Sequence, residues 1–122
     1  MLYNRRQLGK EYEEKAKEFL IQRGYEILEQ NYYSRWGEID LIGRNGKYLV
    51  FIEVKYRKNT KNGAGFESVT KRKQKKICQT ALWYITKHHI STDEPIRFDI
   101  VSIDKQGDKE VFTLIQNGFE FQ

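Results

Sequence analysis

Apolar residues recur at helical spacing near the start of the chain. Those of residues 7–23 follow steps of four, four, three and one: Leu8, Tyr12, Ala16, Phe19 and Leu20. Residues at this spacing share one side of an α-helix. Gly24 comes next, and glycine commonly ends a helix. The pattern therefore predicts a first helix over residues 7–23 with one buried side.

Short apolar runs dominate the middle and the end of the chain. Strands are expected over residues 25–28, 39–44, 47–56, 96–103 and 111–115. A second helix is expected over residues 69–87, with these residues inward: Ile77, Ala81, Leu82 and Ile85. The order α-β-β-β-α-β-β predicts an α/β fold, with one mixed central sheet flanked by helices, in a single domain of residues 1–122.

Asn45-Gly46 lies between two apolar runs and predicts a hairpin with a two-residue loop. The expected pairs are then Arg44–Lys47, Ile42–Leu49, Asp40–Phe51 and Glu38–Glu53. Paired residues share a face of the sheet, and so do residues two apart on one strand. One face is therefore expected to carry Glu38, Asp40, Glu53 and Lys55. A four-residue loop would keep this arrangement, whereas a three- or five-residue loop would break it.

Both faces of this hairpin are apolar over much of their length. The face opposite the charged residues is expected to be core: Ile39, Leu41, Tyr48, Val50, Ile52 and Val54. The charged face also carries Ile42, Leu49 and Phe51 near the turn, so the hairpin should lie in a covered sheet. Asp40 and Glu53 would be diagonal neighbours about 7–8 Å apart. Because an unpaired buried carboxylate is costly, a cation or a lysine should compensate them.

The first helix offers one more carboxylate. With 3.6 residues per turn, Glu11, Glu14 and Glu18 fall opposite the apolar stripe. Glu13 lies at the edge of the stripe, three residues before Ala16. We therefore expect Glu13 to point toward the sheet.

Carboxylates beside a lysine suit the hydrolysis of phosphodiester bonds. Their hard oxygen atoms select Mg²⁺ or Mn²⁺ as the metal, and such a metal activates water for attack. The lysine can stabilise charge on the phosphate. A structural alternative stays open, in which Lys55 forms an ion pair with Glu53 or Asp40 in an edge strand.

Composition adds a mild positive charge. Lys and Arg number 22 against 17 Asp and Glu, which gives a net charge of +5 and a pI near 9.3. This excess favours polyanionic partners such as nucleic acid, although an ordinary solvated surface explains it equally well. The single cysteine, Cys78, suits a reducing compartment. No apolar run is long enough for a membrane span, and no signal core follows the first residues, so we expect a cytoplasmic protein without a membrane partner.

Two central motifs resemble a known family of bacterial proteins. They are Gly37-Glu38-Ile39-Asp40-Leu41-Ile42 and Val50-Phe51-Ile52-Glu53-Val54-Lys55-Tyr56-Arg57. Further matching positions are Gly9, Glu13, Ala16, Phe19, Leu20, Gly24, Tyr25, Ile27, Leu28, Asn31, Val69, Arg72, Lys73, Gln74, Ala81, Arg97, Phe98 and Asp99. In these motifs the chain resembles the YraN family over nearly its whole length. That family is similar to the restriction-endonuclease-like superfamily, which includes archaeal Holliday-junction resolvases.

The resemblance implies a restriction-endonuclease-like core and a set of site residues. It places the helix acid at Glu13, the strand acids at Asp40 and Glu53, and the lysine at Lys55. Val54 completes the expected metal ligands, together with the three acids. Two positions depart from the pattern: Ile39 stands where the superfamily has proline, and Tyr12 stands where the family often has glycine.

Basic residues at the start of the second helix are candidates for phosphate contacts. One further candidate, Arg57, lies at the end of the preceding strand. The expected nucleic-acid-binding residues are therefore Arg57, Arg72, Lys73, Gln74 and Lys76. Cations at a helix N-terminus oppose the helix macrodipole, which makes a purely structural role less natural. A solvated helix face is the alternative. The loop over residues 57–65 could fold over DNA, or be an ordinary surface loop.

These observations favour a metal-dependent deoxyribonuclease that acts in repair or recombination, with branched DNA as one candidate substrate; the sequence does not distinguish branched from linear DNA. The alternative is a non-catalytic nucleic-acid-binding module with the same fold. A third reading is a partner-binding adaptor, which an exposed apolar patch around Trp83-Tyr84 would favour. Trp36 suits base stacking or simple packing. A homodimer would fit a symmetric junction.

Overall fold

The computed structural model describes residues 5–58 and 69–122 of the chain, and the side chains from residue 7 onward. The elements are α1 (Arg5–Gln22), β1 (Glu26–Ser34), β2 (Gly37–Asn45), β3 (Tyr48–Arg57), α2 (Lys71–Lys87), β4 (Ile96–Gln106) and β5 (Lys109–Phe119). Their order confirms the predicted α-β-β-β-α-β-β arrangement. The loop proposed over residues 57–65 falls largely outside the described residues.

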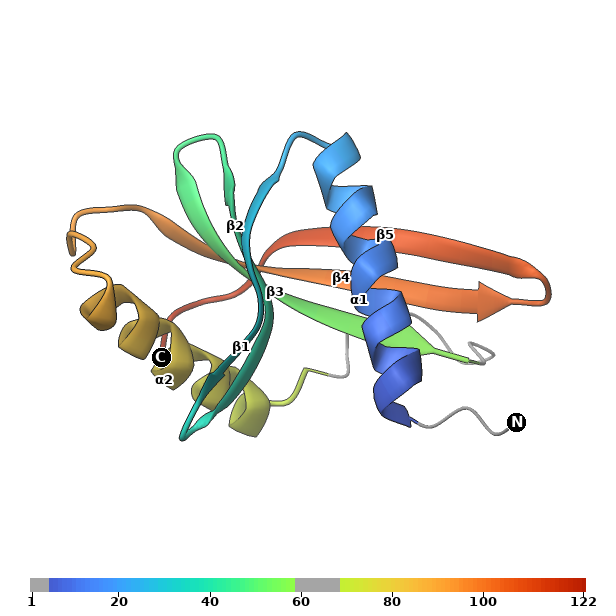
Figure 1. Cartoon of the computed structure of the whole chain (residues 1–122), viewed down its shortest axis with the longest axis horizontal. Helices are drawn as coiled ribbons and strands as arrows, with labels where there is room; N and C mark the ends of the chain where they lie inside the picture. Colours follow the sequence, from blue (N-terminus) through green and yellow to red (C-terminus); the bar gives the residue numbers. More distant parts are fainter. Residues whose placement is uncertain (1–4, 59–68) are drawn as a thin grey trace.

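The five strands form one mixed sheet in the order β1-β2-β3-β4-β5. Strands β3 and β4 are parallel, and the other neighbours are antiparallel. Helix α2 lies in the connection between the two parallel strands, as parallel pairs require. The sheet is strongly twisted, and the two helices lie apart on either side of it (Figure 1). This is the mixed α/β architecture that the sequence predicts.

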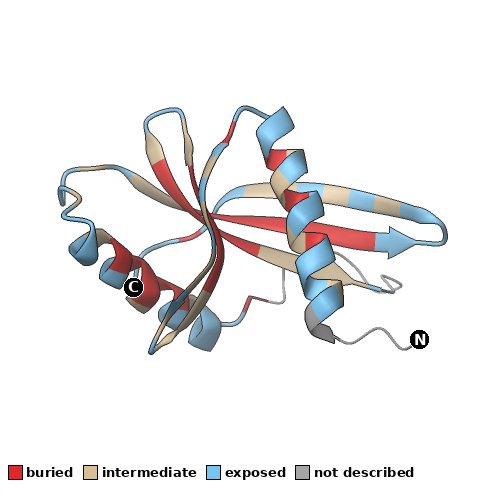
Figure 2. Cartoon of the chain, in the orientation of Figure 1, coloured by how far each residue is buried: buried red, intermediate tan, exposed pale blue. Residues whose placement is uncertain are grey.

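Each helix covers its own hydrophobic cluster. Helix α1 buries Tyr12, Ala16 and Leu20 against Leu41, Val50, Ile52, Val101 and Ile103. Helix α2 buries Ile77, Cys78, Ala81 and Tyr84 against Ile42, Leu49, Phe51, Phe98 and Phe119. Because alternate residues of β3 belong to different clusters, the central strands are covered on both faces (Figure 2).

The ends of the helices follow their sequence signals. Gly24 has a positive φ of 90° after α1, which glycine adopts without strain. Thr70 caps α2 by accepting a hydrogen bond from the Lys73 N–H. The inward position predicted for Leu82 is wrong, because its side chain is 52% exposed. Tyr84 takes the buried place instead.

The β2–β3 turn differs from the prediction by one position on each strand. Asn45 pairs with Tyr48 and Ile42 with Phe51, so the loop residues are Gly46 and Lys47. Asn45 stays in the strand, where its Oδ1 accepts a hydrogen bond from Arg97 Nη2 (2.9 Å). The shift changes each pairing by two residues, so the side chains next to the turn keep their predicted faces: Ile42, Leu49 and Phe51 lie under α2, and Leu41, Val50 and Ile52 under α1.

The predicted alternation of faces fails at Ile39. This residue belongs to the cluster under α2, whereas Leu41 belongs to the cluster under α1. The neighbouring strand is irregular here, since Asn31 of β1 has a positive φ of 49°. Asn31 lies between the paired positions Gln30–Leu41 and Tyr32–Ile39, opposite Asp40. The break in alternation therefore coincides with Asp40.

Candidate metal centre

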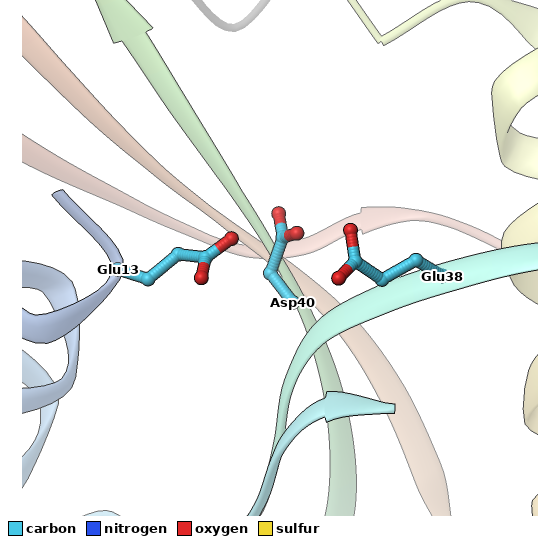
Figure 3. Close-up of side chains that lie close together, drawn as sticks. All are labelled: Glu13, Glu38 and Asp40. Atoms are coloured by element: carbon cyan, nitrogen blue, oxygen red, sulfur yellow. The ribbon is translucent and has the colours of Figure 1, made fainter. Parts of the chain in front are cut away.

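Three carboxylates from two elements meet beside the middle of the sheet. Glu13 comes from α1, and Glu38 and Asp40 come from β2. Each offers an oxygen atom, and these atoms lie within 4.8 Å of one another. Asp40 lies between the two glutamates, and all three carboxylates turn toward one another (Figure 3). Such convergence of like charge calls for a compensating cation.

Asp40 is held firmly by the neighbouring strand. Its side chain is buried, and its Oδ2 accepts a hydrogen bond from the Val54 N–H (2.8 Å). Burial, together with the negative charge of Glu53, raises the pKa of Asp40 well above its usual range. The charged form of Asp40 is therefore costly in the absence of a cation.

Glu53 lies on the central strand, β3. The β2–β3 pairing extends to Leu41–Ile52, and Asp40 and Glu53 are the next residue on each strand. Asp40 accepts a hydrogen bond from the Val54 N–H, and the charge of Glu53 helps to raise the pKa of Asp40, so the two acids are neighbours on adjacent strands. The Glu53 side chain is only 3% exposed, and it forms an ion pair with Lys73 of α2.

Two lysines border the acids. Lys55 follows Glu53 on the same strand, and burial together with the positive charge of Lys73 lowers the pKa of Lys55. Burial also disfavours the charged form of Lys73, but Glu53 and Asp40 outweigh this effect and raise its pKa. The opposite shifts show that Lys73 neutralises the acids, while Lys55 is the more easily deprotonated lysine.

Asn31 is a site residue that the sequence analysis did not identify. Its Nδ2 donates hydrogen bonds to Glu13 Oε1 (2.7 Å) and to Glu38 Oε2 (3.1 Å). Burial raises the pKa of Glu13, and the bond from Asn31 partly offsets that rise. Asparagine tolerates the left-handed backbone better than most residues. The sequence carries no local signal for that φ value.

Glu38 was placed on the charged face by the alternation of β2, but not among the expected ligands. The structure brings Glu38 into the same cluster as Glu13 and Asp40, with their oxygen atoms within 4.8 Å of one another. Val54 contributes its backbone N–H to Asp40, and its service as a metal ligand stays a prediction. The strand alternation was thus the signal that could have identified Glu38.

The other residues expected to bind nucleic acid lie on β3 and α2, the elements that also carry Glu53 and Lys73. Arg57 ends β3, and Arg72 and Lys76 are exposed in the first turns of α2. Gln74 has a structural role: its Nε2 donates to the Val69 carbonyl (2.9 Å), and its Oε1 accepts from Gln122 Nε2 (2.6 Å).

The donor set fits a hard divalent cation. The converging groups are carboxylate oxygens, which Mg²⁺ and Mn²⁺ prefer over softer ligands. Their negative charge is concentrated at buried or half-buried positions, where a cation would offset the cost of ionisation. Glu13, Glu38, Asp40 and Glu53 are therefore the residues that could hold such an ion.

Within the described residues, no helix is long and apolar enough to cross a membrane.

The class that fold and site define is an α/β protein with an acid- and lysine-lined centre on its middle strands. The model of the uncharacterised protein family UPF0102 matches residues 12–103. The chain belongs to this family, which is the YraN family that its motifs resemble.

Relatives in several bacteria match most of the chain. A UPF0102 protein of Fusobacterium nucleatum is 48% identical over 99 residues, which cover 81% of this chain and 82% of the relative. A UPF0102 protein of Legionella pneumophila is 44% identical over 112 residues, covering 92% and 93%. A UPF0102 protein of Lachnoclostridium phytofermentans is 40% identical over 117 residues, covering 96% of each chain.

Proposed function

We propose that the protein is a metal-dependent nuclease that hydrolyses phosphodiester bonds in DNA. The observation that carries the proposal is the convergence of the Glu13 and Asp40 carboxylates, with Glu53 close enough to raise the pKa of Asp40 and with Lys55 within the electrostatic reach of Glu53 and Asp40. Three separate elements supply these four residues. A purely structural ion pair between Lys55 and one acid would not require the carboxylates of Glu13 and Glu38 to converge on Asp40 as well.

The acids have distinct roles in this proposal. Asp40 and Glu53, on adjacent strands, and Glu13, on the helix, would hold the metal. A bound Mg²⁺ or Mn²⁺ supplies charge neutralisation and a lowered pKa for water. Asn31 keeps Glu13 and Glu38 turned toward Asp40. The Val54 N–H fixes the orientation of the Asp40 carboxylate.

The lysines act on the phosphate side. Lys55 is half-buried and has a lowered pKa, so it can hold or release a proton near the attacked phosphate. Arg72 and Lys76 are exposed on α2, where they contact phosphates further along the strand. Lys73 forms an ion pair with Glu53, and its ammonium would also pair with a phosphate oxygen of bound DNA.

The alternative is a nucleic-acid-binding module that does not cut. The basic start of α2 supports binding in both cases. The buried acids favour the nuclease, because a pure binder gains nothing from carboxylates next to phosphate. An adaptor for a protein partner is a third candidate, since Trp83 is 43% exposed, but it leaves the acids without a purpose.

Cleavage of labelled linear, flapped and four-way-junction DNA tests the proposal. Each substrate is incubated with Mg²⁺ or Mn²⁺ and, separately, with EDTA. The variants Asp40→Asn, Lys55→Ala and Glu13→Gln should lose metal-dependent cutting. Glu18→Gln is the matched control, because Glu18 is an exposed carboxylate on the same helix.

The outcomes separate the candidates. Metal-dependent cutting that the three site variants lose and Glu18→Gln keeps supports the nuclease. DNA binding without cutting by the wild-type protein would leave the binding module. Cutting that survives Asp40→Asn would come from a contaminant or another site, and would overturn the residue assignments.

A further inference from the structure

Both tryptophans of the chain lie together on the surface. A cavity of about 370 Å³ is lined by Trp36, Gln79, Leu82, Trp83 and Thr86, and these residues are called the tryptophan pocket below. Trp83 is 43% exposed and Leu82 is 52% exposed. Aromatic side chains of this size normally contribute to a core. Here half-buried Trp36 and exposed Trp83 and Leu82 form an apolar hollow, and exposed apolar patches mark binding surfaces.

The tryptophan pocket is built between two elements. Trp36 lies in the turn from β1 to β2, and Trp83 lies on α2. Their ring centroids are 6.2 Å apart, with planes tilted by 56°. The hydroxyls of Ser34 and Thr80 share a hydrogen bond of 2.7 Å, which ties the turn to the helix. The pocket is therefore preorganised rather than formed by loose side chains.

Cations stand beside the aromatic rings. The guanidinium carbon of Arg35 lies 4.6 Å from the centre of the Trp36 ring. Lys76 comes within reach of the same turn, because a Cβ placed on Gly37 would lie 3.7 Å from Lys76 Cβ. Apolar ring faces bordered by cations complement a flat base attached to a phosphate backbone.

The tryptophan pocket and the candidate metal centre take residues from the same two segments of the chain, the residues around the start of β2 and helix α2. Trp36 comes two residues before Glu38 in the sequence. On α2, Lys76 and Trp83 follow Lys73 by three and ten residues, so all three share one side of the helix. The distance from Lys73 to Trp83 along the helix axis is about 15 Å. At about 3.4 Å per nucleotide, this corresponds to roughly four nucleotides of a stacked strand.

We propose that the tryptophan pocket binds an unstacked base of single-stranded or flapped nucleic acid, whose backbone passes over Lys76 to the metal centre. This inference rests on the proposed function, and it assigns a substrate class to the same site. Bases inside a duplex present only their edges, so their faces cannot stack on Trp83. A free strand exposes those faces.

Intrinsic fluorescence tests the proposal directly, because Trp36 and Trp83 are the chain's two tryptophans. The protein is titrated in EDTA with a single-stranded oligonucleotide, a flapped duplex and a blunt duplex of equal length. Stacking predicts quenching by the first two probes and little change with the blunt duplex. EDTA prevents metal-dependent cutting, so the binding measurement does not depend on the proposed activity.

Variants decide which property of the tryptophan pocket matters. Trp83→Ala should weaken flap binding by roughly 5- to 100-fold and leave blunt-duplex binding within about twofold. Trp83→Phe keeps an aromatic face and should recover most of the affinity. Leu82→Ala is the comparison within the pocket: it removes apolar surface but no ring, so it should weaken flap binding less than Trp83→Ala does. Thermal melts establish that each variant is folded.

Several results would overturn the inference. Equal loss for flap and blunt duplex, or absence of quenching by any probe, removes the base-binding role even when metal-dependent cutting is present. An effect of Leu82→Ala as large as that of Trp83→Ala, joined by loss of a dimer in sedimentation, would assign the pocket to a second copy of the chain. Quenching retained by Asp40→Asn upholds the pocket even if the nuclease proposal fails.

Discussion

The amide of Asn31 donates a 2.7 Å hydrogen bond to the carboxylate of Glu13 and thereby links β1 to α1 at the metal centre. The same nitrogen also bonds Glu38 (3.1 Å), so one side chain holds two acids that would otherwise repel each other. Its backbone adopts a left-handed φ of 49° at this position. The amide therefore keeps the two glutamate carboxylates in place beside Asp40.

Two substitutions at Asn31 distinguish the role of its side-chain amide from that of its backbone conformation. Asn31→Gly keeps the left-handed φ but removes the amide, and we expect Mn²⁺ affinity to fall by about tenfold or more. Asn31→Ala should show the same fall in Mn²⁺ affinity. It should also lower the free energy of unfolding by about 1 kcal/mol, because alanine is strained at this φ. Calorimetric Mn²⁺ titration and thermal melts measure the two effects. Wild-type Mn²⁺ affinity in Asn31→Gly would contradict the role of the amide.

Asp40→Asn should stabilise the metal-free protein. The buried carboxylate has a raised pKa, so its ionisation opposes folding at neutral pH. The neutral amide keeps an oxygen that can accept the Val54 N–H bond. We expect a gain of about 1 kcal/mol in the free energy of unfolding at pH 7. Urea denaturation in EDTA provides the measurement.

The pH dependence of this gain has a definite sign. The advantage of Asp40→Asn is fully present above the raised pKa of Asp40. It shrinks as pH falls through that pKa, and it vanishes below the ordinary value of 3.8. Adding Mn²⁺ should stabilise the wild type more than the variant, because the metal needs the carboxylate. A gain that did not change with pH would rule out this electrostatic origin.

Removal of Lys73 should destabilise the fold and change its neighbour. Lys73→Gln leaves the buried Glu53 carboxylate without its cation, at a cost of about 1–3 kcal/mol. The pKa of Lys55 should rise at the same time, because the positive charge of Lys73 helps to lower it. Lys75→Gln, an exposed lysine of the same helix, is the control. Adding Glu53→Gln to Lys73→Gln should restore part of the lost stability; a purely additive loss would exclude the ion pair.

A second buried charge lies away from the metal centre and should affect stability alone. Asp99 is fully buried and receives Arg97 Nε (2.8 Å), Arg97 Nη2 (2.7 Å) and the Tyr25 hydroxyl (2.7 Å). Asp99→Ala strands the guanidinium and should cost about 3–5 kcal/mol. Chemical denaturation measures that loss. Cutting per folded molecule should remain unchanged, and a selective loss of cutting would link Asp99 to the centre.

The sequence predicted those features that depend on alternation and spacing. The faces of Ile42, Leu49 and Phe51 follow from the period of two in strands, and they survived a wrong choice of loop residues because the shift was even. Arg97 and Asp99 are two residues apart on β4, and they form an ion pair. The inward side of α2 was right at Ile77 and Ala81.

The features that the sequence did not predict depend on tertiary geometry. The left-handed φ of Asn31 arises where β1 passes Asp40, and no neighbouring residue signals it. The ion pair of Lys73 with Glu53 requires the packing of α2 against the sheet. Leu82 was expected inward from helical spacing, but the buried side of α2 is narrower than its apolar stripe. Periodicity reports which residues can be buried, not where a neighbouring layer stops.

The position of Lys73 on α2 has a consequence for a chain still being synthesised. Residues 13–55, which include every acid of the centre, leave the ribosome before the helix that neutralises Glu53. The parallel neighbour of β3, strand β4, is also synthesised later. A chain that ends before α2 therefore has neither the Lys73 ammonium that pairs with Glu53 nor the strand that pairs with β3. The order of translation itself delays assembly of the centre until most of the polypeptide is available.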